Sequence, residues 1–165
     1  MATSNAHKVG FFDCNCSFGR PARPPFRYAD SAPALLGEMD WCGIDAALVH
    51  HANQRFASPV TWNPALLDEV KGRRRLAPAW AILPEPCREL PSADQLVVEM
   101  QRRGVAALWA FPQEHRYRLD ECSFRGLFRL MARKRIPLFA KENLASLKDL
   151  LEDCPELPVV AVNQG

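Results

Sequence analysis

Chemically capable side chains recur at the ends of short apolar runs along this sequence. These polar residues are Asp13, Asn15, Ser17, His50, His51, His115, Lys141 and Asn163. Carboxylates and imidazoles exchange protons and bind metals, and a desolvated lysine acts as a base or forms a Schiff base. Where strands run parallel, such residues meet at the carboxyl ends of the strands. The elements that carry them therefore decide whether they form one site.

Six apolar runs begin about thirty residues apart, which is the size of one strand–helix unit. The runs span residues 11–16, 46–49, 76–83, 105–111, 136–140 and 159–162. Each run is apolar on both faces and is bounded by glycine, proline or charge. That pattern is typical of a strand that is buried on both sides.

Helical patterns lie between the runs, at residues 32–41, 63–72, 92–104 and 121–135 and after Asn143. Asp30 or Ser31 can cap the first helix, Asn63 followed by Pro64 can begin the second, and Ser92 with Gln95 forms a capping-box pattern in the third. Alternating strands and helices favour a parallel sheet covered by helices.

Both a closed barrel and an open sheet are compatible with this alternation of strands and helices. Neither a glycine-rich dinucleotide fingerprint nor a Walker A sequence is present, so the nucleotide-binding folds lose their main support. We therefore predict an incomplete α/β barrel of the (β/α)8 TIM type with about six units. A flavodoxin-like open sheet is the alternative. Residues 1–9 are expected to be an N-terminal tail, and residues 10–165 the partial barrel.

Composition narrows the class of protein. The chain has 165 residues, of which 48% are hydrophobic and 24% charged, as in ordinary globular domains. Its net charge of +2 is too balanced to indicate a nucleic-acid partner. No apolar run approaches a membrane span, and no secretory signal is evident. The six cysteines are then expected to be reduced in a cytoplasmic protein.

The apolar runs and their flanks resemble one enzyme family in order along the chain. The matching segments are FFDCNCSFG, MDWCGIDAALVHH, RLAPAWAILP, RRGVAALWAFP, KRIPLFAKE and CPELPVVAVNQG. They are similar to the first six strands of the amidohydrolase-related superfamily, of the amidohydrolase 2 type. The resemblance implies a TIM barrel of the metal-dependent hydrolase or decarboxylase kind. Its known members act on small carboxylated or cyclic compounds.

The sequence departs from that family at the metal ligands. The family's histidine positions fall on Asn15, Ser17, Lys141 and Asn163. Neutral asparagine and serine are poor zinc ligands, and a lysine ammonium repels a cation. We therefore expect no metal or other cofactor from this stretch, unless zinc uses ligands outside the family pattern. Cys14 and Cys16 are such candidates, but alternation on a strand points them toward the helices if Asn15 and Ser17 face the barrel axis.

Three functions remain open. The first is a relative with a degenerate metal site that binds a small acidic or carbonyl ligand, with Asn15, Ser17, His51, His115 and Asn163 lining the pocket around Lys141. The second is a metal-free enzyme in which Lys141 and Asp13 form the acid–base pair; in the structural alternative, the same pair only replaces the charge of the missing metal. The third is a non-catalytic, partner-binding or split-barrel protein.

Length bears on the third hypothesis. A complete barrel of this type needs about 250 residues, and the sequence ends with its sixth predicted strand. Open edges invite pairing with another chain. We therefore expect either a fragment of a longer chain or a homo- or hetero-oligomer that completes the barrel.

Overall fold

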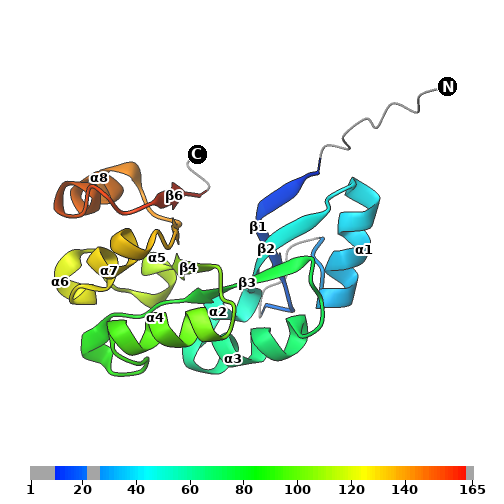
Figure 1. Ribbon diagram of the computed structural model, residues 1–165, viewed down its shortest axis with the longest axis horizontal. Helices are drawn as coiled ribbons and strands as arrows, with labels where there is room; N and C mark the ends of the chain where they lie inside the picture. Colours follow the sequence, from blue (N-terminus) through cyan, green and yellow to red (C-terminus); the bar gives the residue numbers. More distant parts are fainter. Residues whose placement is uncertain (1–9, 22–26, 163–165) are drawn as a thin grey trace.

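Six parallel strands form the sheet of the computed structural model, which describes residues 10–21 and 27–162 (Figure 1). The strands are β1 (Phe12–Phe18), β2 (Ala46–His51), β3 (Leu76–Ala81), β4 (Ala107–Ala110), β5 (Leu138–Ala140) and β6 (Val159–Ala161). Each strand pairs with the next one along the chain, in the order β1-β2-β3-β4-β5-β6. A flavodoxin-like sheet would place β1 in its interior. The open-sheet alternative is therefore wrong, and the predicted barrel architecture is confirmed.

Helices connect the strands and cover the outer face of the sheet (Figure 1). They are α1 (Ala32–Cys42), α2 (Ala52–Phe56), α3 (Pro59–Val70), the 3-10 turn η1 (Glu85–Cys87), α4 (Ala93–Arg102), α5 (Pro112–His115), α6 (Glu121–Phe124), α7 (Leu127–Lys134) and α8 (Leu144–Asp153). Among the helices of the described residues, none has the length and apolar character needed to cross a membrane.

Capping signals correctly located two of these helices. Ser31 Oγ accepts the Ala34 N–H at 3.4 Å at the start of α1, and Gly43 ends that helix with a φ of 72°. At α8, Asn143 Oδ1 accepts the Ser146 N–H at 2.9 Å. These side chains satisfy backbone groups that have no partner within the helix.

Three helix predictions need correction. The helix expected over 121–135 is divided into α6 and α7, because Arg125 and Gly126 both take a positive φ. The predicted capping box at Ser92 is not formed, since its side chain makes no capping hydrogen bond. Helix α3 begins at Pro59, so Asn63 lies inside the helix and does not cap it.

Asn63 instead joins a buried amide pair with Gln54. The recorded pairing of β2 with β3 stops before Ala79. Beyond it, Gln54 Nε2 donates to Ala79 O at 3.1 Å and to Asn63 Oδ1 at 2.7 Å. Asn63 Nδ2 donates to Ala81 O at 2.9 Å, and Asn63 Oδ1 accepts the Ala81 N–H at 2.9 Å. Two side chains therefore satisfy the backbone of β3 where its neighbour departs.

The inner face of the sheet is apolar, as the sequence predicted. Its buried residues are Leu48, Ala79, Ala81, Ala107, Trp109, Phe111, Phe139 and Val162. Trp109 stacks on Phe111 with ring centroids 5.2 Å apart and lies 5.3 Å from the Phe139 ring. A larger core fills the space between the outer face and the helices. The two cores together hold the strand ends, and the side chains that follow them, in fixed positions.

The two edges of the sheet are β1 and β6. At the β1 edge, Phe11 and Phe12 are 63% and 59% exposed. Exposed aromatic side chains beside an edge strand are compatible with pairing to another chain. The completion of the barrel by an oligomer stays a prediction.

Candidate functional site

Charged side chains from three strand ends meet at the carboxyl end of the partial barrel. Arg55 lies in α2 after β2, Glu114 in α5 after β4, and Lys141 directly after β5. Arg55 Nε donates to Glu114 Oε1 at 2.6 Å, and its Nη2 contacts the same oxygen. Lys141 Nζ lies 3.9 Å from that oxygen. We call Arg55, Glu114 and Lys141 the mouth cluster.

The mouth cluster carries one more positive than negative charge. Its side chains are 26%, 17% and 32% exposed for Arg55, Glu114 and Lys141, so an incoming ligand can reach the two cations. Glu114 Oε2 is buried and has no hydrogen-bond partner among the described residues. Two cations from different strands, around one carboxylate, favour a bound anion.

Burial keeps His50 neutral beside this cluster. The ring lies on the inner face, 4.7 Å from Trp109 and 5.6 Å from Phe111 between centroids. Desolvation is the largest cause that lowers the pKa of His50 to about 3; the charges of Arg55 and His51 act in the same direction, and the Cys16 backbone opposes them. Its Nδ1 is buried without a partner in the described part of the chain. His50 therefore offers an uncharged polar atom to the barrel interior.

His115 occupies a similar environment. Desolvation lowers the pKa of its imidazole, against the opposing effects of the Ala57 carbonyl and the Glu114 carboxylate. Its ring lies 6.0 Å from the Phe111 ring. Neither ring nitrogen meets hydrogen-bond geometry with another described residue. The structure thus places His115 beside the mouth cluster, where burial disfavours its protonated form.

The buried His50 predicts that acid weakens the fold. Its folded pKa of about 3 lies below the ordinary value of 6.5, so below that value the unfolded chain binds a proton that the folded chain does not. We expect the free energy of unfolding to fall by about 1.4 kcal/mol per pH unit from this residue between roughly pH 6 and pH 4. Urea unfolding at several pH values measures the slope. In a His50→Phe variant, the contribution of His50 to the pH dependence of the free energy of unfolding should be lost. A slope equal to that of the parent would contradict the lowered pKa of His50.

His51 lies on the opposite face of β2, among the helices. Its Nδ1 accepts the Asn53 N–H at 3.1 Å, which caps α2. The ring stacks on Trp62 at 4.2 Å, and its Nε2 lies 3.5 Å from Glu69 Oε1. Burial lowers the pKa of His51. The structure therefore does not bring His51 to the predicted ligand pocket, because neighbouring strand residues point to opposite faces.

The structure brings Lys141 to Glu114, whereas Asp13 lies elsewhere. Asp13 Oδ1 accepts the Asn15 N–H at 2.8 Å, and Asp13 lies close enough to Cys16 to raise its thiol pKa. Burial is the larger cause of that shift, which brings the Cys16 pKa to about 12. The predicted pairing of Lys141 with Asp13 is replaced by the ion pair with Glu114 within the described chain. Asn163 lies outside the described residues.

Strand β1 departs from the simple alternation that the sequence suggested. Its pairing with β2 shifts register between Asp13 and Cys16, which inserts an extra residue into the ladder. Asn15 and Ser17 are exposed. Cys16 packs against the core beneath the helices, as predicted. Of the two cysteines expected to face the helices, Cys16 therefore packs as predicted, whereas Cys14 is exposed.

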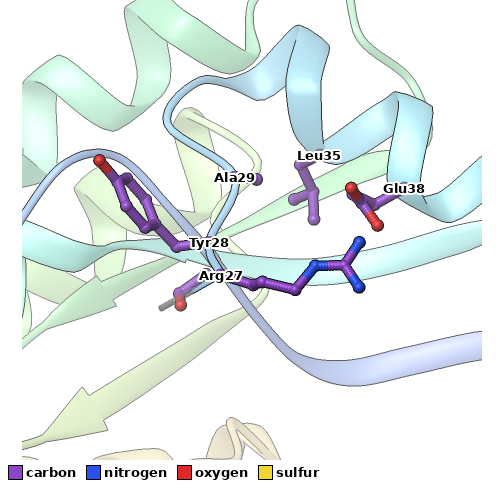
Figure 2. A pocket seen from close by; sticks show the side chains of 6 residues that line it. Arg27, Tyr28, Ala29, Leu35 and Glu38 are labelled. Carbon is purple, nitrogen blue, oxygen red and sulfur yellow. The ribbon is translucent and has the colours of Figure 1, made fainter. Parts of the chain in front are cut away.

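Two pockets adjoin at the carboxyl end of β1. The first, of about 430 Å³, is lined by Ser17, Arg27, Tyr28, Ala29, Leu35 and Glu38. Figure 2 shows Arg27 and Glu38 extending to one side of it and the Tyr28 ring turned to the other. The second, of about 310 Å³, is lined by Ser17, Phe18, Gly19, Pro21, Tyr28, Ala29, Ala52, Arg55 and Phe56. Arg55 thus links this second pocket to the mouth cluster.

The residues at this end do not suit a catalytic metal ion. Asn15, Ser17 and Lys141 stand where the resembling family places imidazoles, and the lysine ammonium lies beside the carboxylate that could otherwise bind a cation. Within residues 10–21 and 27–162, no three histidine, cysteine, aspartate or glutamate side chains are arranged to hold an ion.

Arg55 is the site residue that sequence analysis missed. It lies in α2, a five-residue helix with no strong sequence signal, in the segment between the second and third strands. Its guanidinium lies 4.8 Å above the Phe56 ring and in contact with Glu114, 59 positions away. The sequence feature that could have indicated Arg55 was its position shortly after the second strand, because sites in barrels form at the carboxyl ends of strands.

Comparisons with known proteins identify the fold. No protein-family model and no curated protein matches the sequence. Similar solved structures include a probable 2-pyrone-4,6-dicarboxylic acid hydrolase from Acinetobacter baumannii with citric acid bound, at 13% identity and a TM-score of 0.65. Another is the 2,6-dihydroxybenzoate decarboxylase from Rhizobium, at 15% identity and a TM-score of 0.63. A third is an amidohydrolase from Mycobacterium avium subsp. paratuberculosis, at 15% identity and a TM-score of 0.56.

The chain covers only part of each of these proteins. Alignments span 93%, 93% and 82% of this chain but 58%, 66% and 48% of the respective structures. A TIM-barrel protein of uncharacterised function from Bordetella bronchiseptica is similar over 80% of this chain and half of its own length, at 14% identity and a TM-score of 0.57. In its fold, the described part of the chain is therefore a partial TIM barrel of six parallel strands.

Proposed function

We propose that this chain binds a small carboxylated compound at the mouth cluster, in a barrel of the hydrolase or decarboxylase type. One observation carries the proposal: Arg55 and Lys141 converge on a single oxygen of Glu114 at the carboxyl ends of the strands. That is the end at which TIM-barrel enzymes bind their substrates. The excess positive charge there suits an anionic ligand.

The pocket beside Arg55 supports a ligand with an apolar body. Phe18, Tyr28 and Phe56 line it together with Ser17 and Arg55, and its volume of about 310 Å³ is within the range that accepts a small molecule. A ligand carboxylate would take N–H groups of Arg55 that Glu114 leaves free, because a guanidinium has five donors. The aromatic rings would then cover the rest of the ligand.

The similar structures support the same ligand class. The probable 2-pyrone-4,6-dicarboxylic acid hydrolase holds citric acid, and the Rhizobium enzyme is a decarboxylase of 2,6-dihydroxybenzoate. In this chain, the buried imidazoles of His50 and His115 lie beside the cluster, and because burial lowers the pKa of both, they would offer uncharged hydrogen-bonding nitrogens to the ligand. Lys141 would hold the anion, and Glu114 would position both cations.

Isothermal titration calorimetry with citrate and with 2,6-dihydroxybenzoate tests the proposal. We expect Arg55→Ala and Lys141→Ala each to weaken binding about tenfold, the loss expected for one charge-assisted hydrogen bond. Lys134→Ala is the matched control, because Lys134 is an exposed cation on α7 and its loss should leave affinity unchanged. Circular dichroism verifies that each variant is folded. Unchanged affinity in folded Arg55→Ala and Lys141→Ala proteins, or no binding by the parent chain, would overturn the proposal.

A further inference from the structure

We propose a second anion site at the opposite end of the sheet, which takes an organic phosphate: a phosphoryl group carried on an apolar or aromatic body. The site is a pocket of about 460 Å³ beside the amino-terminal ends of β3 and β4. Its cationic lining residues are Lys71, Arg73, Arg74 and Arg103. We call these four residues and the space between them the basic pocket. It shares no residue with the mouth cluster.

The basic pocket combines a charged rim with an apolar wall. The apolar lining residues are Leu67, Val70, Leu76 and Pro78, of which Val70, Leu76 and Pro78 are buried. Asp68 is the one acidic residue in the lining, against four cations. The chain as a whole is nearly neutral, with 21 basic and 19 acidic residues. The lining of this pocket therefore carries an excess of positive charge, of which Glu99, paired with Arg103, offsets a part.

Two of the cations are held in place. Arg73 Nη1 donates to Glu69 O at 2.6 Å and to Lys71 O at 3.4 Å, which fixes the guanidinium over the end of α3. Arg103 Nε donates to Glu99 Oε1, which fixes a second guanidinium at the end of α4. Each group has five N–H donors and uses only part of them in these contacts. Preorganised donors cost little conformational entropy when an anion binds.

The other two cations are available to a ligand. Lys71 and Arg74 are exposed, and neither forms an ion pair with another described residue. Gly72 and Gly104 form part of the lining with φ values of 76° and 71°. A Cβ atom at either glycine would meet nothing within 4 Å, so the backbone between the cations is open to a ligand.

A phosphate matches this arrangement better than the other common anions. A phosphate monoester carries close to two negative charges and three strong acceptor oxygens at neutral pH. Guanidinium groups bind such oxygens through paired N–H donors. The apolar wall has nothing to offer a free inorganic anion, and it favours a compact ligand over a long nucleic-acid backbone. The shared chemistry points to a phosphorylated small molecule.

Calorimetry at low salt with AMP, adenosine and inorganic phosphate tests this inference on the whole chain. We expect AMP to bind more tightly than adenosine and than inorganic phosphate, because only AMP engages both the rim and the wall. The double variant Lys71→Ala/Arg74→Ala should weaken AMP binding at least about tenfold. Its matched control is Arg133→Ala/Lys134→Ala, which removes the same charge from exposed positions of α7 and should change AMP affinity less than twofold.

The outcomes separate the proposal from its rivals. Equal weakening by both double variants would show general charge attraction and overturn the site. Tighter binding of oligo(dT) than of AMP, lost in Lys71→Ala/Arg74→Ala, would assign the surface to nucleic acid and overturn the proposed ligand class. No AMP binding by the parent chain would also overturn it. Because citrate binding depends on Arg55 and Lys141 at the other end, either proposal can fail while the other stands.

Discussion

An Asn63→Ala variant is expected to lose about 4 kcal/mol of its free energy of unfolding, a larger loss than most single substitutions cause. Asn63 is 4% exposed, and its side chain bonds both backbone groups of Ala81 and the amide of Gln54. Removal of the side chain takes away these partners of the Ala81 N–H and C=O groups, and it leaves Gln54 Nε2 with Ala79 O as its remaining acceptor. Each unsatisfied buried group costs about 1–3 kcal/mol.

Urea unfolding at neutral pH measures this loss. Asn53→Ala is the matched control, because Asn53 lies in α2 near Gln54 and, among the described residues, only its backbone forms hydrogen bonds. We expect that variant to stay within about 0.5 kcal/mol of the parent. A Gln54→Ala/Asn63→Ala double variant should lose less than the sum of the single losses, because the two amides bond each other. Stability of Asn63→Ala equal to that of Asn53→Ala would contradict the account of the amide pair.

A Gly19→Ala variant is expected to lose about 3 kcal/mol of stability. Gly19 has a φ of 96°, and a Cβ built on it would lie 2.1 Å from His51 Nε2. The imidazole cannot easily move aside, because it stacks on Trp62 and its Nδ1 accepts the Asn53 N–H. The added methyl group would therefore displace the cap of α2, and with it the helix that carries Arg55.

A double-mutant cycle separates the two causes of this loss. In a His51→Ala background the steric overlap is absent and only the backbone strain at residue 19 remains. Gly19→Ala should then cost about 1–2 kcal/mol, measured by urea unfolding. Gly43→Ala serves as control, because Gly43 has a φ of 72° but a Cβ there would meet nothing within 4 Å. An equal cost of Gly19→Ala in both backgrounds would exclude the contact with His51.

Local signals in the sequence predicted most of the fold. Short apolar runs between helical patterns predicted six buried strands, and capping residues such as Ser31 and Asn143 predicted where α1 and α8 begin. These signals work because they act within one turn or one strand. The same signals were ambiguous at Asn63. Asparagine is a common helix-capping residue, but the side-chain amide of Asn63 lies inside a helix and forms hydrogen bonds with the backbone of β3.

The candidate site was only partly predictable for the same reason. The rule that sites lie at strand ends selected Lys141 and His115; the structure places Lys141 in the mouth cluster and His115 beside it. It also selected His51, which points to the helices because it follows His50 on the strand. Asp13 was paired with Lys141 on charge alone. Glu114 takes that place because α5 begins directly after β4 and turns its carboxylate toward β5.

The sequence by itself determined the order of strands and helices, the apolar character of both sheet faces, and the absence of imidazoles at Asn15, Ser17 and Lys141. Periodicity and residue type are local properties, so no tertiary information is needed for them. Only the tertiary structure decided that Arg55 joins Glu114 and Lys141, and that Lys71, Arg73, Arg74 and Arg103 gather at the opposite end. Contacts between residues far apart in the chain depend on sheet curvature and helix packing, which no short stretch of sequence encodes.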